Sequence, residues 1–436
     1  MKVTSSIIIC FLLKFTVLSQ SNFSLKIKIE SVTEDKAQLW SYYGNQEKFI
    51  DSIRFGANGL AIYKRNTSLP KGLYKIVLPN STSFELIIAE QVISIETDII
   101  TSEKSMRIKK SIENKIYYDL KHFINRQRKQ LISLGRSFKN ARITKDGFNF
   151  KTDSINQTIR QKKLDIISNN PDLIVSAYIK AEMNPLIDQS NKEPYLKYTL
   201  DFLDQIDFNN TALLYSPILT DRIQEYLTDI IAPYPSEKIK AVDNILRRTR
   251  ASSTKSFLAT MFLNDFSEMA RLGDDEVFVH MVDHYLGDCS INQEATKAFK
   301  KTSLEIKPFL RGKQFPGNYF ELETPLSTIN AKYTLVVIWN KDVSQQYLNL
   351  LYDFSKSYER YGLKVLSIRV NTTKDKLHLG HQKNWYHGVL NQTFDDLLRV
   401  STTSATELIF LDQNKKIIAR DISLDDLIDT LDAWEK

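Results

Sequence analysis

Cysteine is almost absent from this chain. The 436 residues include only two cysteines, Cys10 and Cys289. Two distant cysteines exclude the disulfide framework of a small secreted scaffold, a four-cysteine zinc site and the Cys-x-x-Cys motif of a dithiol redox enzyme. Glycine and proline are also scarce, with 13 and 11 residues, which excludes a collagen-like or low-complexity chain.

A large excess of one charge is missing as well. The chain has 59 Lys and Arg against 52 Asp and Glu, a net charge of +7 that does not by itself indicate a nucleic-acid partner. With 42% hydrophobic and 25% charged residues the composition is that of a folded protein. The length predicts more than one domain.

The hydrophobic run at the start of the chain is too short to span a membrane. Lys2 precedes the apolar residues 7–13, and residues 17–19 are small enough for cleavage after Ser19. This pattern predicts a signal peptide over residues 1–19 and export to the periplasm or cell envelope, with a retained anchor as the alternative. Lys14 interrupts the run, and a spanning helix needs about 20 apolar residues, so we expect no transmembrane span after signal removal. Cys289 would then be the sole thiol, either packed or reactive.

Residues 20–100 have the pattern of short β-strands. Residues 23–29 alternate apolar and polar side chains, and residues 37–42 follow in the same way. Asn58-Gly59 marks a turn before further strands at residues 60–63, 74–78 and 84–88. The pattern predicts an all-β sandwich.

Residues 101–305 predict an α-helical domain. Apolar residues recur at three- or four-residue steps along a first long helix at Ile108, Ile112, Ile116, Leu120, Ile124, Leu131 and Leu134. Asn170-Pro171 and Ser216-Pro217 are typical starts of later helices.

Positive charge is concentrated in residues 104–145, which we call the basic segment. It holds thirteen Lys and Arg against two acidic residues, Glu113 and Asp119. The pattern indicates a solvated helix face opposite a buried apolar stripe, with Tyr117, Tyr118, Phe123 and Phe138 as packing residues. The alternative is contact with an anionic glycan, a lipid headgroup or an acidic envelope protein. We expect no nucleic-acid partner for an exported chain.

Residues 306–436 change to alternating strands and helices. An apolar strand at residues 333–339, an amphipathic helix at 344–361 and a strand at 363–370 predict a parallel βαβ unit. A hairpin at residues 407–420 and a helix at 424–434 follow. This order predicts an α/β thioredoxin-like fold.

The C-terminal segment resembles the thioredoxin-like domains of bacterial envelope proteins, and the upstream segments resemble modules that precede such domains in Bacteroidetes. The small β module of these proteins is matched at Asp51-Ser52, Asn58-Gly59 and residues 69–74. An uncharacterised helical family is matched at residues 113–115, 170–171, 216–226 and 275–280. The resemblance implies architecture more than activity, because the helical family has no assigned activity.

The resemblance also implies where redox residues would stand. Counting from Trp339 as in thioredoxins, the two catalytic cysteines fall at Val343 and Gln346, and the cis-proline falls at Thr406. Catalysis needs a thiolate of low pKa at a helix start and a second thiol to release the mixed disulfide. Valine and glutamine supply neither, so we expect no redox site and no cofactor.

Two groups of histidines are weak metal candidates. Glu276, His280 and His284 recur every four residues on one predicted helix, but a straight helix directs only two adjacent turns at one ion. His378, His381 and His387 lie in a loop-rich stretch, where we expect surface or turn histidines. We therefore expect no metal site.

The function expected from the sequence is that of a non-catalytic thioredoxin-like binding or scaffold protein of the bacterial cell envelope. The first alternative is an envelope thiol-disulfide oxidoreductase that works through Cys289. The second is a peptide- or glycan-binding protein that uses the β module and the basic segment.

Overall fold

The computed structural model describes residues 23–30, 32, 36–269, 274–340, 343–370, 384–390, 406–420, 423–425, 427–428 and 431. The predicted signal peptide, His378 and His381 lie outside the described residues. The chain forms two compact units, Met1–Tyr226 and Leu227–Lys436.

The first unit begins with strands that form two four-stranded sheets, here called the β module. These strands are β1 (Phe23–Glu30), β2 (Lys36–Tyr43), β3 (Gln46–Arg54), β4 (Leu60–Arg65), β5 (Gly72–Val77), β6 (Ser83–Ile88), β7 (Val92–Asp98) and β8 (Arg107–Lys110). The sheet orders are β4-β1-β7-β8 and β3-β2-β5-β6. Strand β8 pairs antiparallel with β7 at the edge of the first sheet.

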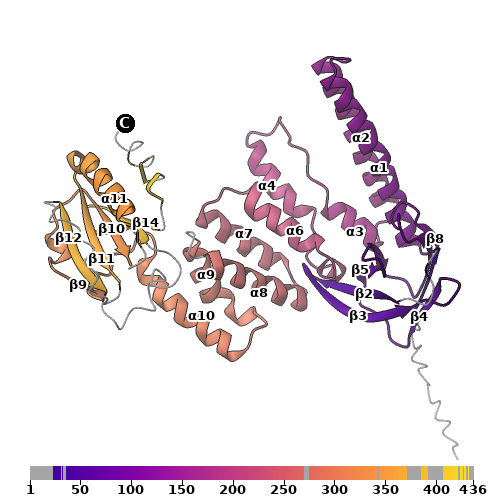
Figure 1. Ribbon diagram of the computed structural model, residues 1–436, viewed down its shortest axis with the longest axis horizontal. Helices are drawn as coiled ribbons and strands as arrows, with labels where there is room; N and C mark the ends of the chain where they lie inside the picture. The colour runs from indigo at the N-terminus through magenta and orange to yellow at the C-terminus, as the bar shows by residue number, and fades with distance from the viewer. Residues whose placement is uncertain are drawn as a thin grey trace, which may run out of the picture. The chain divides into compact units, whose positions relative to one another are not determined.

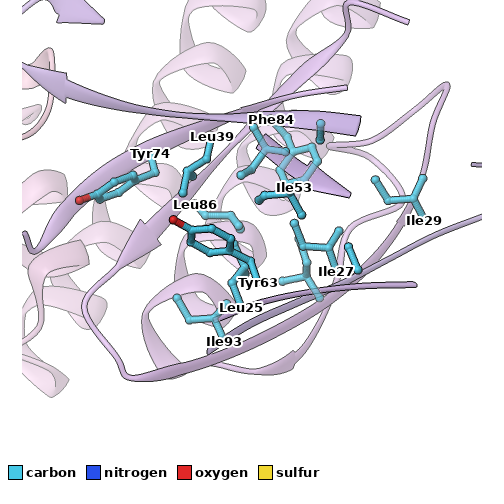
Figure 2. Close-up of a cluster of buried hydrophobic side chains, with 14 of the residues drawn as sticks. Leu25, Ile27, Ile29, Leu39, Ile53, Tyr63, Tyr74, Phe84, Leu86 and Ile93 are labelled. Atoms are coloured by element: carbon cyan, nitrogen blue, oxygen red, sulfur yellow. The ribbon is translucent and has the colours of Figure 1, made fainter. Parts of the chain in front are cut away.

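One hydrophobic cluster is built from both sheets of the β module. Alternate residues of β1, such as Leu25 and Ile27, are fully buried and meet Leu39 of β2 and Phe84 of β6 (Figure 2). The period of two seen in the sequence therefore directs one side of each sheet to a shared core. Gly59 closes the predicted turn after β3 with a φ of 68°, a left-handed conformation that favours glycine.

Helices complete the first unit. They are α1 (Ile112–Lys139), α2 (Lys145–Asn169), α3 (Ile174–Ala181), α4 (Pro194–Asp204), α5 (Thr211–Leu214) and α6 (Ile218–Glu225), followed by a π-helical turn at Tyr226–Ile230. The helix starts expected after Asn170-Pro171 and Ser216-Pro217 are confirmed by α3 and α6.

The first turn of α1 joins three parts of this unit. Ser111 caps the helix by accepting the N–H of Asn114 at 3.0 Å. The buried Asn114 side chain accepts the N–H of Ile87 in β6 at 2.8 Å and donates to the Ile87 carbonyl at 2.7 Å. The carboxylate of Glu113, also buried, accepts the N–H groups of Ile174 and Val175 at the start of α3. Burial raises the pKa of Glu113, and these two hydrogen bonds oppose the rise.

The predicted buried stripe of the first long helix is only partly correct. Ile108 belongs to β8, and Ile112 is 63% exposed, whereas Leu120 is buried and the packing residue Tyr118 belongs to the core cluster of the β module. Farther along, α1 runs beside α2 and away from the sheets (Figure 1), and Phe138 is 39% exposed. The apolar stripe is not buried here because this half of α1 packs against α2, and a single helix is too narrow to bury it.

The second unit contains the remaining helices and a mixed sheet. Its helices are α7 (Pro235–Arg248), α8 (Ser252–Met269), α9 (Asp275–Tyr285), α10 (Gln293–Ile306) and α11 (Gln345–Tyr358). Its strands are β9 (Phe320–Leu322), β10 (Tyr333–Trp339), β11 (Leu363–Arg369), β12 (Trp385–Leu390), β13 (Thr406–Leu411) and β14 (Ile417–Arg420).

The six strands form one sheet of order β14-β13-β10-β11-β12-β9. Strands β10 and β11 are parallel and joined through α11, while β13 runs antiparallel to β10 and pairs with β14. This order confirms the predicted βαβ unit and hairpin, and it is the strand arrangement of a thioredoxin-like fold (Figure 1). Of the predicted helix at 424–434, the described Leu424, Leu427 and Leu431 are buried on the same face as α11.

Two strands of this sheet were not predicted. Strand β12 pairs parallel to β11, and β9 pairs with β12. Gly388 weakens the strand pattern of β12, yet a Cβ at this position would lie 2.6 Å from the Leu322 side chain of β9. Gly388 makes the strand pattern of β12 hard to recognise in the sequence, and its lack of a side chain permits β9 to approach closely.

The described residues contain no helix that is both long enough and apolar enough to cross a membrane.

We expect Asn114→Ala to lower the free energy of unfolding by about 2–4 kcal/mol, because the buried N–H and C=O of Ile87 would each lose their partner on α1. Chemical denaturation of the purified chain measures this difference. Asn125→Ala, which truncates an exposed asparagine on the same helix, is the matched control and should change stability little. Equal effects of the two substitutions would show that the contact to β6 is not an anchor.

Candidate functional site

The candidate site is the amino end of α11, where β10 ends and the helix begins. Trp339 closes β10, and its indole N–H donates to the Ser367 hydroxyl of β11 at 2.8 Å. Ser344 is the N-cap of α11, and its Oγ accepts the N–H of Tyr347 at 3.1 Å. The first-turn amide groups of α11 and the positive end of the helix dipole favour negative charge here.

The position predicted for the nucleophile is occupied by a core residue. Val343 lies immediately before the N-cap and is 6% exposed, in the cluster that contains Trp339 and Leu348. Its N–H donates to the Asn340 carbonyl at 3.3 Å. Gln346, in the first turn of α11, is exposed. Neither side chain can form a mixed disulfide.

The position predicted for the proline is Thr406, which lies beside the end of β10. Thr406 is the first residue of β13 and is paired with Trp339 in the antiparallel register. It is half-buried, and the peptide bonds of the described residues are all trans. Ala405, which precedes it, lies outside the described residues. The sheet therefore brings the end of β13 next to the end of β10, with threonine there instead of proline.

The side chain that caps the helix is Ser344, which the sequence reasoning did not single out. A cap accepts hydrogen bonds from the first helical turn, so it is the place at which a thiolate would be stabilised. The signal for this residue is its position directly before the amphipathic pattern of α11. A serine at this point keeps the capping function and has no thiol.

A buried charge cluster at Glu407, the residue after Thr406 in β13, was also missed. The Arg420 Nε donates to the Glu407 carboxylate at 2.8 Å, and a terminal nitrogen of Arg420 donates to Asp275 of α9 at 3.2 Å. Burial raises the pKa of Asp275, and the Arg420 charge opposes the rise. The sequence signal was Glu407 at the start of an otherwise apolar strand. The cluster joins α9 to the sheet within the second unit.

The weak metal candidates of α9 do not converge. The His280 Nε2 lies 2.8 Å from Asp243 Oδ1 of α7, and Glu276 Oε1 lies 3.5 Å from Arg311 Nε. The rings of His280 and His284 are 4.5 Å apart. Burial would raise the pKa of Asp243, but hydrogen bonds from His280 and Tyr285 lower it. Within the described ranges no three His, Cys, Asp or Glu side chains are placed to hold a metal ion.

His387, the described member of the second histidine group, lies in β12 opposite Ser367 and is half-buried. It is thus a strand residue and not a loop residue as predicted. The strand character follows from pairing with β11, which the local sequence does not show.

Cys289 is a weak nucleophile in its surroundings. Its thiol is half-buried and donates to the Tyr285 carbonyl at 3.4 Å. Burial, together with the negative charge of Asp288, raises the pKa of this thiol to about 11. At neutral pH the thiol is therefore almost entirely protonated, whereas thiol-disulfide exchange requires the thiolate.

The chain is similar to several solved structures. A thioredoxin-like protein from Bacteroides caccae is 17% identical, with a TM-score of 0.44 over 58% of this chain and 98% of that one. A domain of a possible thiol-disulfide isomerase from Cytophaga hutchinsonii is 25% identical, with a TM-score of 0.25 over 29% of this chain and 93% of that one. A putative thiol:disulfide interchange protein from Chlorobium tepidum is 13% identical, with a TM-score of 0.24 over 28% and 96%.

No protein-family model and no curated protein matches the sequence. The thioredoxin-like assignment of the C-terminal sheet rests on its strand order.

We expect a cysteine placed at the cap of α11 to have a lowered pKa, because the Tyr347 N–H, which donates to the Ser344 hydroxyl, and the positive end of the helix dipole would stabilise a thiolate. In a Cys289→Ser background, Ser344→Cys should titrate below the usual value of about 8.5. The thiolate absorbance during a pH titration measures this. Leu350→Cys, 52% exposed in the middle of α11, is the control and should titrate near the usual value. Identical titration of the two thiols would contradict the proposed electrostatics of the helix start.

Proposed function

We propose that this chain is a non-catalytic thioredoxin-like binding or scaffold protein of the bacterial cell envelope. We also propose that it is exported by a signal peptide over residues 1–19 and has three domains, at residues 20–100, 101–305 and 306–436. The observation that carries the loss of catalysis is the core residue Val343 at the amino end of α11, followed by the serine cap.

Retention of the fold without the dithiol has a physical basis. The thioredoxin-like sheet is stabilised by hydrophobic clusters on both faces, to which Val343 itself contributes. Burial of a valine side chain, relative to its exposure, favours folding by about 1.5–3 kcal/mol, so Val343 contributes to the stability of the core without supplying a reactive group. This combination supports a protein that keeps the architecture for binding.

The partner proposed for such a protein is an envelope protein or an anionic surface that meets the basic segment. The excess of cations there supports attraction to an acidic partner, and we propose no nucleic-acid partner.

The alternative function is that of an envelope thiol-disulfide oxidoreductase that works through Cys289. Partial exposure of this thiol favours the alternative. Its raised pKa and the single described cysteine count against it, because a lone thiol cannot release its own mixed disulfide by an intramolecular step.

We expect the purified chain without its signal peptide to leave the rate of insulin reduction by dithiothreitol unchanged, because Val343 and Gln346 cannot form the mixed disulfide. Turbidity of the precipitating insulin B chain measures the rate, with a dithiol thioredoxin as the positive control. Cys289→Ser should behave as the parent chain. If the parent chain accelerates insulin reduction and Cys289→Ser abolishes this acceleration, the binding role is wrong and the oxidoreductase alternative is supported.

A further inference from the structure

The distal half of the α1–α2 hairpin has no core of its own. Between residues 121 and 165, all of which are described, no side chain is buried. Ile132, Phe138 and Phe150 are 57%, 39% and 76% exposed. Because an exposed phenylalanine costs free energy in water, this concentration of apolar surface far from the β module points to a function outside folding.

The aromatic residues gather where the two helices meet, at residues 136–151, here called the hairpin tip. Phe138 in the last turn of α1 stacks on Phe148 in the first turn of α2, with ring centroids 4.8 Å apart. Phe150 follows and borders a groove of about 400 Å³ between the helices, together with Leu134 and Ile155. The tip lies at the end of the long pair of helices α1 and α2 (Figure 1).

The hairpin tip also carries exposed cations. The exposed cations of the tip are Arg136, Lys139, Arg142, Lys145 and Lys151, and its one acidic residue is Asp146. In the described part of the chain none of these five cations forms an ion pair. Unpaired cations around exposed rings select a partner that offers negative charge and an apolar layer together.

We infer that the hairpin tip docks on an anionic lipid bilayer. Like charges on two tips disfavour a second copy of this chain as the partner. The end of a two-helix hairpin is also narrow for a protein interface, which commonly buries about 800 Å² on each side. A bilayer surface supplies phosphate groups for the cations and, directly beneath them, the headgroup boundary in which aromatic rings are stable.

The two kinds of residue have different tasks in this contact. Lys and Arg draw the tip to the anionic surface over a distance set by salt screening, about 8 Å at physiological ionic strength. Phe138 and Phe150 then enter the headgroup boundary while the long cationic side chains extend to the phosphates. This inference rests on the proposed binding role and specifies the anionic surface.

Co-sedimentation of the full chain without its signal peptide with lipid vesicles tests the inference. We expect binding to vesicles of phosphatidylcholine mixed with phosphatidylglycerol, much weaker binding to phosphatidylcholine alone, and release as salt is raised. Arg142→Gln/Lys145→Gln should lower the partition about fivefold for each charge removed. Lys297→Gln/Lys300→Gln, which removes two exposed cations from α10, should have a much smaller effect.

The apolar part is tested by Phe138→Ser/Phe150→Ser, which should reduce binding at low salt while the thermal unfolding temperature stays close to that of the parent. Tyr195→Ser, at an aromatic residue 71% exposed on α4, is the matched control and should bind as the parent does. Absence of vesicle binding, or equal binding by the tip variants and their controls, would overturn the inference. The insulin assay is independent of these outcomes, so the binding role and the bilayer contact fail separately.

Discussion

The arrangement of the first unit depends on how a long helix is held at only one end. Glu113 and Asn114 lie side by side in the first turn of α1, and both use their side chains to bind backbone groups of other elements. Backbone groups at a sheet margin or a helix start need partners when they are buried, and these two residues supply them. Beyond Leu120, no buried side chain holds α1 to the sheets. The distal part of the hairpin therefore lacks a core.

The second unit shows that a reactive site and the scaffold beneath it are separable. The strand order, the capped start of α11 and the adjacent ends of β10 and β13 are present. These features arise from apolar burial and backbone pairing, neither of which needs a thiol. Val343 and Ser344 stand at the helix start and carry no thiol, and the surrounding architecture forms with these residues in place.

The sequence predicts the elements whose signals are local. The apolar run of β10 and the amphipathic pattern of α11 identify that strand and helix, since both patterns arise from burial within a few residues. Strand β12 was missed because Gly388 serves a neighbour whose position depends on the folded sheet. Arg420 and Asp275, 145 residues apart, and Glu113 and Ile174, 61 residues apart, meet only through tertiary structure. The apolar stripe of α1 was predicted to be buried because the spacing of its apolar residues identifies one face of the helix. The spacing does not show whether another element packs against that face.

The absence of a core in the distal hairpin also affects how readily its helices open locally. Its amide hydrogens are protected by helical hydrogen bonds and a shallow contact between two helices, so local opening there need not involve the β module. We therefore expect backbone hydrogen exchange in the distal hairpin to proceed through local opening rather than through global unfolding. For the same reason, the removal of paired turns from the distal parts of α1 and α2 would remove no side chain of the module core.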